Sequence, residues 1–235
     1  MACGLGQQMT TDQTPDLEWR DGLTPISVRF NDPYFSMADG LAETQHVFLA
    51  GNGLPQRFRP GFHVAELGFG TGLNMLATLA AWEQCGVPGK LAFTSFEAFP
   101  MDVAQMQRAL RAFPSLEDIG QRFFSVWDGQ NATAELTFAS VRVITGDARQ
   151  LLPNWSGQAN AWFLDGFSPA KNPELWEPEL MAEVARHTAP NGTFATYSAA
   201  GHIRGALGKA GFSVDRVAGF GRKRHMTTGT LKASK

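Results

Sequence analysis

Short apolar runs alternate with longer amphipathic stretches through most of the chain from residue 62 onward. Runs bounded by glycine or proline are typical of buried strands, whereas apolar residues recurring every three or four positions indicate helices. These patterns predict strands at residues 62–68, 91–98, 141–147, 159–167 and 192–198. Helices are predicted at residues 71–85, 100–113, 172–189 and 201–211. This alternation favours an α/β fold with a mostly parallel sheet and helices on both faces.

The N-terminal part of the chain departs from this alternation. Residues 1–17 are polar and are expected to form a disordered tail, which leaves 18–235 as a single domain. Within it, residues 18–60 are an N-terminal extension. The extension holds a short predicted strand at 25–30, then a turn, then a helical period over 37–54.

Three features modify the rest of the pattern. Residues 114–140 have no readable period and are treated as an insertion. Pro178 is expected to break or offset the helix predicted over 172–189. Two consecutive strands, 212–220 and 222–231, close the chain and predict an antiparallel pair at the sheet edge.

Composition narrows the class of protein. The chain has 235 residues, which suits one α/β domain, and its net charge of −2 provides no global basic field for nucleic acid or membrane. Two cysteines, Cys3 and Cys85, build no disulfide framework and suit a reducing compartment. No secretory signal and no apolar run of roughly 18 residues is present in the sequence. We therefore expect a cytoplasmic protein without membrane contact.

A glycine-rich turn joins the strand at 62–68 to the helix at 71–85. Gly68, Gly70 and Gly72 have the spacing GxGxG, whereas a dinucleotide fingerprint needs its third glycine at the position of Leu73. The sequence GK[ST] of a phosphate-binding loop is also missing from this turn. Glycines at such a junction allow a sharp turn and close approach of a ligand. The alternative is a turn that binds nothing.

Acidic residues follow the next two strands. Glu97 ends the second strand, where a carboxylate accepts two hydrogen bonds from a ribose diol. Asp147 follows the third strand and is a candidate acceptor for an adenine amine, although either residue can instead be a helix cap. Because ligands of open α/β sheets bind along the carboxyl ends of the strands, S-adenosylmethionine is the ligand we expect.

Asp165 follows the fourth strand and directly precedes Gly166, which should direct its carboxylate into the same crevice. Methyl transfer is an in-line displacement, and much of its acceleration comes from positioning. An amine nucleophile must first lose its extra proton, and a nearby carboxylate can bind the ammonium and take that proton. Asp165 is therefore the candidate catalytic residue; a cap or a loop-fixing aspartate is the alternative.

Three further residues are candidates for substrate binding. Tyr34 lies in a turn expected to fold over the pocket, Phe167 can stack on a base, and Lys171 can meet a phosphate. Core packing for the aromatic residues and simple solvation for the lysine are the alternatives. The histidines show no metal-ligand spacing, so we expect no metal.

Several segments resemble the methyltransferases of the MnmC/MnmD type, across about residues 18–231. The segments are NDPYFS, GLAETQHVFLAGNGLPQRF, AELGFGTGLN, SFEAFP, WFLDGFSPAKNPELW and GRKRHMTTGTL. The resemblance implies a Rossmann-like methyltransferase fold and S-adenosylmethionine-dependent methylation of the 5-aminomethyl group on the wobble uridine of tRNA, usually 2-thiolated. It implies that cofactor-lining residues are Glu66, Gly68, Gly70, Gly72 and Asn74, with Glu97 at the ribose and Asp165 in the catalytic crevice.

One departure from the family pattern concerns a second domain. In bifunctional members an FAD-dependent oxidoreductase domain follows and prepares the substrate; this sequence has no second glycine-rich fingerprint, so no FAD is expected in this chain. It is either a stand-alone enzyme or one half of a larger protein, with such an oxidoreductase as a possible partner.

The tRNA partner rests mainly on the resemblance, because the basic residues are few. Arg57 and Arg59 form one small cluster, and Arg222, Lys223 and Arg224 form another that we expect to contact phosphates. A small-molecule N- or O-methyltransferase and a non-catalytic binding module on the same fold are the alternatives.

Overall fold

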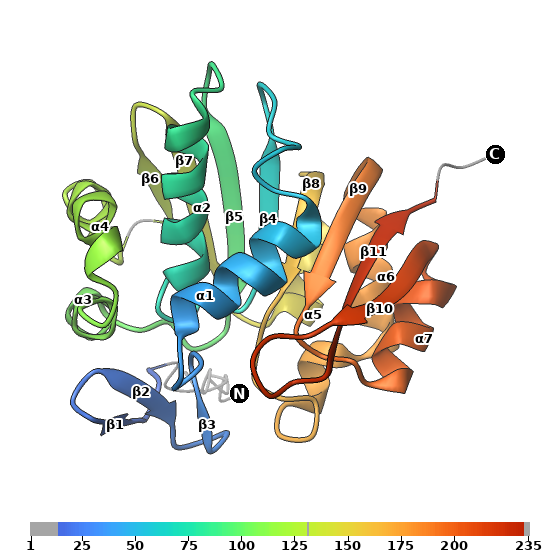
Figure 1. Ribbon diagram of the computed structural model, residues 1–235, viewed down its shortest axis with the longest axis horizontal. Coiled ribbons are helices and arrows are strands. Elements are labelled where there is room, and N and C mark those ends of the chain that lie inside the picture. The colour runs from blue at the N-terminus through green and yellow to red at the C-terminus, as the bar shows by residue number, and fades with distance from the viewer. Residues whose placement is uncertain (1–13, 131, 233–235) are drawn as a thin grey trace, which may run out of the picture.

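The computed structural model describes residues 14–130 and 132–232, and within these ranges eight strands form one sheet in the order β10-β11-β9-β8-β4-β5-β7-β6 (Figure 1). The strands are β4 His63–Leu67, β5 Leu91–Glu97, β6 Thr133–Glu135, β7 Ala139–Thr145, β8 Ala159–Leu164, β9 Thr188–Thr196, β10 Phe212–Ala218 and β11 His225–Leu231. Strands β7, β5, β4, β8 and β9 are mutually parallel, and β11 runs antiparallel between β9 and β10. The predicted α/β class and its antiparallel edge are confirmed.

The opposite edge of the sheet corrects the treatment of residues 114–140. This segment contains a helix, α4 Glu117–Phe124, and the strand β6, which pairs antiparallel with β7. A strand of three residues is too short for an alternating pattern to be recognised. Both edges of the sheet are therefore antiparallel.

Helices cover the two faces of the sheet. They are α1 Gly40–Thr44, α2 Leu73–Cys85, α3 Val103–Leu110, α5 Ala148–Leu151, α6 Pro178–Arg186 and α7 Gly201–Lys209, in addition to α4. Side chains of α2 and α4 share one buried cluster with Val64 and Phe163, and those of α6 and α7 share another with Ala65 and Trp162. Successive strand residues thus serve opposite cores, as expected for a sheet buried on both sides.

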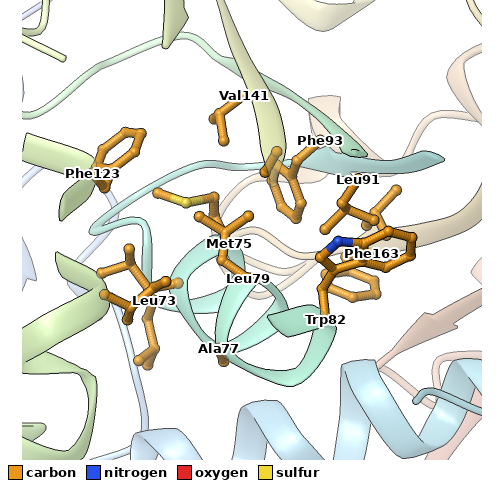
Figure 2. Close-up of a cluster of buried hydrophobic side chains, with 14 of the residues drawn as sticks. Leu73, Met75, Ala77, Leu79, Trp82, Leu91, Phe93, Phe123, Val141 and Phe163 are labelled. Carbon is orange, nitrogen blue, oxygen red and sulfur yellow. The ribbon is translucent and has the colours of Figure 1, made fainter. Parts of the chain in front are cut away.

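Helix α2 packs centrally on the sheet. Figure 2 shows Met75, Leu79 and Trp82 of α2 near Phe93 of β5 and Phe163 of β8, all of them fully or almost fully buried. Burial of each such side chain stabilises the fold by about 1.5–3 kcal/mol. Because the first turn of α2 follows the glycine-rich turn directly, this packing fixes the turn relative to the strand ends.

The helix predicted over 172–189 is divided at Pro178. A short 3-10 turn, Pro173–Trp176, precedes α6, and Pro178 is the first residue of α6, where its missing N–H costs nothing. The strand β9 then begins at Thr188 and not at residue 192 as predicted.

The N-terminal extension forms a separate antiparallel sheet of β1 Leu17–Arg20, β2 Thr24–Ser27 and β3 Asp32–Pro33 (Figure 1). The strand predicted at 25–30 is thus shorter and has partners outside the main sheet. The predicted helix over 37–54 appears as α1, followed by the π-helical segment Gln45–Leu49 and a 3-10 turn. The predicted tail lies mostly outside the described residues. Among the described helices, each is too short or too polar to cross a bilayer.

Candidate active site

A cavity of about 1010 Å³ opens at the carboxyl ends of β4, β5, β7 and β8. The residues of the sequence prediction on its wall are Tyr34, Gly68, Gly70, Asn74, Glu97, Asp147, Asp165, Phe167 and Lys171. Glu66 and Gly72 do not lie on this wall: Glu66 is fully buried below it, and Gly72 is the N-cap of α2. Parallel strands bring these side chains together because their carboxyl ends meet at one edge of the sheet.

The glycine-rich turn needs glycine chiefly for contacts within the protein. Gly68 has a φ of +88°, and a Cβ there would stand 2.5 Å from the backbone oxygen of Asp165. Gly70 has a φ of +52°, and a Cβ there would stand 3.1 Å from the ring of Tyr34. Both values of φ lie in the left-handed region that favours glycine. The sequence analysis gave both a sharp turn and close approach of a ligand as reasons for these glycines; the positive φ values agree with the turn, and the approach of a ligand stays a prediction.

Glu97 lies at the end of β5, beside the glycine-rich turn. One carboxylate oxygen accepts a hydrogen bond from Gly70 N at 2.9 Å, and the other accepts from Phe99 N at 2.8 Å. Burial raises the pKa of Glu97, and the hydrogen bonds from backbone N–H groups oppose that rise. The carboxylate also lines the cavity, where its oxygens can accept hydrogen bonds from hydroxyl groups of a ligand.

Asn74 joins two carboxyl groups below and beside the cavity. Its amide nitrogen donates to Glu66 Oε1 at 2.9 Å and to Asp165 Oδ2 at 2.8 Å. Its amide oxygen accepts from Thr44 Oγ1 at 2.8 Å, and Ser95 Oγ donates to Glu66 Oε2 at 2.7 Å. Burial raises the pKa of Glu66 well above its ordinary value. Glu66 therefore supports Asn74, and Asn74 in turn orients Asp165.

Thr44 and Ser95 were not among the predicted site residues. Neither residue carries a sequence signal, because a buried hydroxyl in a helix or strand is common in any core. Only the three-dimensional arrangement shows that they hold the amide and carboxyl groups of this network in place.

Asp165 stands where the chain leaves β8. Its second oxygen accepts a hydrogen bond from Gly166 N at 2.9 Å. Burial raises the pKa of Asp165 to about 7, and the hydrogen bonds from Asn74 and Gly166 oppose that rise. A carboxyl group with this pKa can both take and release a proton near neutral pH.

Two of the predicted residues, Asp147 and Lys171, form salt bridges within the protein. Asp147 is the N-cap of α5, accepting from Arg149 N at 2.9 Å, and its carboxylate pairs with the Arg149 guanidinium at 2.7 Å. This hydrogen-bonded pair lowers the pKa of Asp147. Lys171 pairs with Asp32 at 2.8 Å and donates to the backbone oxygen of Asn31. Lys171 thereby ties β3 to the loop after β8.

Aromatic rings line the wall between β3 and the loop after β8. The ring of Tyr34 meets that of Phe167 edge-on at 4.9 Å, and Phe167 stacks on Phe30 at 4.7 Å. Burial raises the pKa of Tyr34, with a further rise from Glu97. Phe30 thus covers one face of the Phe167 ring.

The wall also includes Glu43, Tyr197 and Lys223, which the sequence reasoning did not place in the site. Tyr197 directly follows β9, so the rule that found Asp165 after β8 would also have selected this tyrosine. Within residues 14–130 and 132–232, no group of three or more His, Cys, Asp or Glu residues has the arrangement of a metal site.

Comparison with known proteins identifies the family. A family model described as S-adenosyl-L-methionine-dependent methyltransferase matches residues 113–232, half of the chain. The chain belongs to this methyltransferase family. The residues on the cavity wall fit its cofactor, because Glu97 offers two acceptor oxygens to a ribose diol and the glycine-rich turn leaves the carboxyl ends of β4 and β5 open.

Curated relatives of this methyltransferase include the tRNA 5-methylaminomethyl-2-thiouridine biosynthesis bifunctional proteins MnmC of Stutzerimonas stutzeri and Pseudomonas aeruginosa. The first is 42% identical over 233 residues, which cover 94% of this chain and 35% of the relative. The second, from strain PAO1, is 42% identical over 95% of this chain and 36% of its own length. The predicted resemblance is confirmed, and the chain spans about a third of the length of these relatives.

A solved structure, MNMC2 from Aquifex aeolicus, has a similar fold. It superposes with a TM-score of 0.72 and is 26% identical, covering 96% of this methyltransferase and 73% of the other chain. The similarity therefore extends over the N-terminal extension as well as the main sheet.

Proposed function

We propose that this methyltransferase transfers a methyl group from S-adenosylmethionine to the amine of a 5-aminomethyl group on wobble uridine, usually 2-thiolated, in tRNA. The observation that carries the proposal is the 42% identity, over 94% of the chain, to relatives named for 5-methylaminomethyl-2-thiouridine biosynthesis in tRNA. The product is the 5-methylaminomethyl nucleoside.

The donor end of the cavity is formed by the glycine-rich turn, Glu97 and Asp147. Glu97 is oriented by two backbone N–H groups and accepts the ribose hydroxyls, and Asp147 stands at the adenine end. When bound, S-adenosylmethionine supplies an activated methyl whose bond to sulfur breaks as the bond to nitrogen forms.

Asp165 acts on the acceptor amine. The amine arrives largely as an ammonium ion, which cannot attack until it loses a proton. The Asp165 carboxylate binds the ammonium, holds its nitrogen in line with the methyl group and takes the proton. With a pKa of about 7, Asp165 is a stronger base than an exposed aspartate and is still ionised in a useful fraction at neutral pH.

Docking of tRNA depends on a few cations. Arg222 and Arg224 are exposed in the β10–β11 turn, whereas Arg57 donates to Asn52 O and Thr193 Oγ1 and so serves the interior. For a protein of net charge −2, phosphate contacts of this kind give modest and salt-sensitive affinity.

An earlier reaction has to generate the free acceptor amine. The curated relatives are named bifunctional proteins, and the family resemblance implies an FAD-dependent oxidoreductase activity for their second part. We propose that such an activity, on another domain or another protein, supplies the 5-aminomethyl group to this methyltransferase.

The test uses the purified chain, S-adenosylmethionine with an isotopically labelled methyl group, and tRNA from cells that lack the modification. Mass spectrometry of the digested nucleosides should show the label in 5-methylaminomethyl(2-thio)uridine. Asp165→Asn serves as the inactive control. Absence of label from tRNA, with label on a small molecule from the same cells, would refute the proposal and favour a small-molecule methyltransferase.

A further inference from the structure

A lysine of this chain occupies the acceptor side of the cavity. Lys223 Nζ lies 4.1 Å from the centroid of the Tyr197 ring and 2.8 Å from Glu43 Oε1. All three side chains line the same cavity as Asp165. An aromatic face together with a carboxylate is a standard environment for an alkylammonium group.

The ring is held without help from the lysine, and the carboxylate is carried by a helix. Tyr197 follows β9, its hydroxyl donates to Gly166 O at 2.7 Å, and its ring meets Trp176 edge-on at 6.2 Å. Glu43 lies in the first turn of α1, and its side chain is 14% exposed. These two groups form what we call the Tyr197–Glu43 cage, and the hydrogen bond of Tyr197 to Gly166 O ties the ring to the loop that carries Asp165.

Lys223, by contrast, reaches the cage from a surface turn. The turn between β10 and β11 is closed by hydrogen bonds from Gly219 N to Arg224 O and from Lys223 N to Phe220 O. The Lys223 side chain remains 47% exposed, whereas that of Glu43 is 14% exposed. The lysine is therefore the partner that can leave this contact without disturbing the core.

We propose that the Tyr197–Glu43 cage binds the alkylammonium group of the acceptor, and that Lys223 is an internal occupant that the acceptor displaces. The proposal deepens the proposed function, since the amine to be methylated is a primary alkylammonium like the side chain of lysine. The cage lines the same cavity as Asp165, which binds the amine and receives its proton once the amine has moved from the cage towards the methyl group.

The charges around Asp165 are consistent with such an exchange. Burial is the main influence on the pKa of Asp165; the charge of Glu43 raises it further and that of Lys223 lowers it. An acceptor ammonium that replaces Lys223 keeps one cation next to these two carboxyl groups. The exchange therefore leaves no buried carboxylate without a counter-charge.

The first test observes the lysine directly and needs no methyl transfer. In protein labelled with ¹³C-lysine, the ε-methylene signals of Lys223 should be displaced by the ring current of Tyr197 and should be missing from Lys223→Ala. Titration with propylammonium chloride should move these signals towards those of an exposed lysine such as Lys90. The idea is overturned if no displaced signal exists, or if propylammonium leaves it in place.

The second test compares two changes that remove the same charge from the same turn. Lys223→Ala leaves the cage empty. It should lower the KM for tRNA by about fivefold with kcat nearly unchanged, because Lys223 no longer competes with the acceptor ammonium for the cage. Arg224→Ala removes only a phosphate contact and should raise that KM. If Lys223→Ala also raises KM, the lysine serves merely as a clamp or a phosphate ligand and the proposal fails.

The cage itself is tested by Glu43→Gln, which should raise the KM for tRNA several-fold, and by two changes at Tyr197. Tyr197→Leu removes the ring and should raise KM, while Tyr197→Phe keeps the ring face, loses only the hydrogen bond to Gly166 O and should raise KM much less. Lys90→Ala, which breaks an exposed pair with Glu135, should have no effect. If tRNA is never methylated, the proposed function fails while the propylammonium result stands; methylation with unaltered KM values refutes only the cage.

Discussion

Replacement of Asp165 by asparagine should separate the stability of this methyltransferase from its activity. In the folded protein burial raises the pKa of Asp165 to about 7, from an ordinary value of 3.8. Above pH 4 or so the unfolded chain has released this proton, but the folded protein retains it up to about pH 7. Stability contributed by the protonated group is therefore lost as the pH rises through this window.

The size of the effect follows from the width of the window. Between about pH 5.5 and about pH 7 the folded state binds one proton more than the unfolded state, and each pH unit costs about 1.4 kcal/mol. The wild-type free energy of unfolding should thus fall by roughly 2 kcal/mol between about pH 5.5 and about pH 8.5 because of Asp165. Asp165→Asn should not show this part of the fall, since its amide does not titrate.

Urea unfolding of both proteins at the two pH values measures the effect. Asparagine can offer one oxygen to Asn74 or to Gly166 but not one to each, so the variant should be about 1 kcal/mol less stable than wild type at about pH 5.5. At about pH 8.5, where wild type has lost roughly 2 kcal/mol, the variant should instead be about 1 kcal/mol more stable. Asp102→Asn, at an exposed cap where asparagine serves equally well, is the matched control. Equal pH dependence in wild type and Asp165→Asn would refute the assignment of the raised pKa, and normal methyl transfer by the variant would refute its catalytic role.

Three other changes test the donor end, the turn and the tRNA surface. Glu97→Ala should weaken binding of S-adenosylmethionine at least about tenfold by calorimetry, because two charge-assisted hydrogen bonds to the ribose are lost. Gly68→Ala should destabilise the protein by about 2–4 kcal/mol in urea, since its Cβ meets the backbone after β8; Gly205→Ala in α7, with open space around it, should instead stabilise it by about 0.5–1 kcal/mol. Charge reversal at Arg222 and Arg224 together should raise the KM for tRNA and flatten its dependence on salt, and an unchanged KM would remove this turn from the interface.

The central fold was predictable because its strands and helices have strong local patterns. The strand β4, the glycine-rich turn and α2 follow one another without interruption, so both period and turn chemistry indicate the same junction. The strand predicted at 25–30 overlaps β2, but β1, β3 and β6 were missed, because strands of two to four residues are too short to show a period. Their pairing depends on contacts distant in sequence.

The site was predictable where a residue follows a parallel strand. Glu97, Asp147 and Asp165 were found in this way, and all three line the cavity. The role of Glu66 was less accessible: an acid just before the glycine-rich turn suggests contact with a ligand, but the structure buries it beneath Asn74. Lys223 was assigned to the tRNA surface with its neighbours because sequence position alone cannot show that its ammonium turns inward.

The close approach of Gly68 to the backbone oxygen of Asp165 has a consequence for protein engineering. The glycine-rich turn, which we propose receives the donor, and the segment after β8, which carries Asp165, are in direct main-chain contact. A change in one segment therefore shifts the other. Redesign of only the segment after β8, to accept a new acceptor, would also change the affinity for the donor. Grafting both segments together from a single relative preserves their mutual fit.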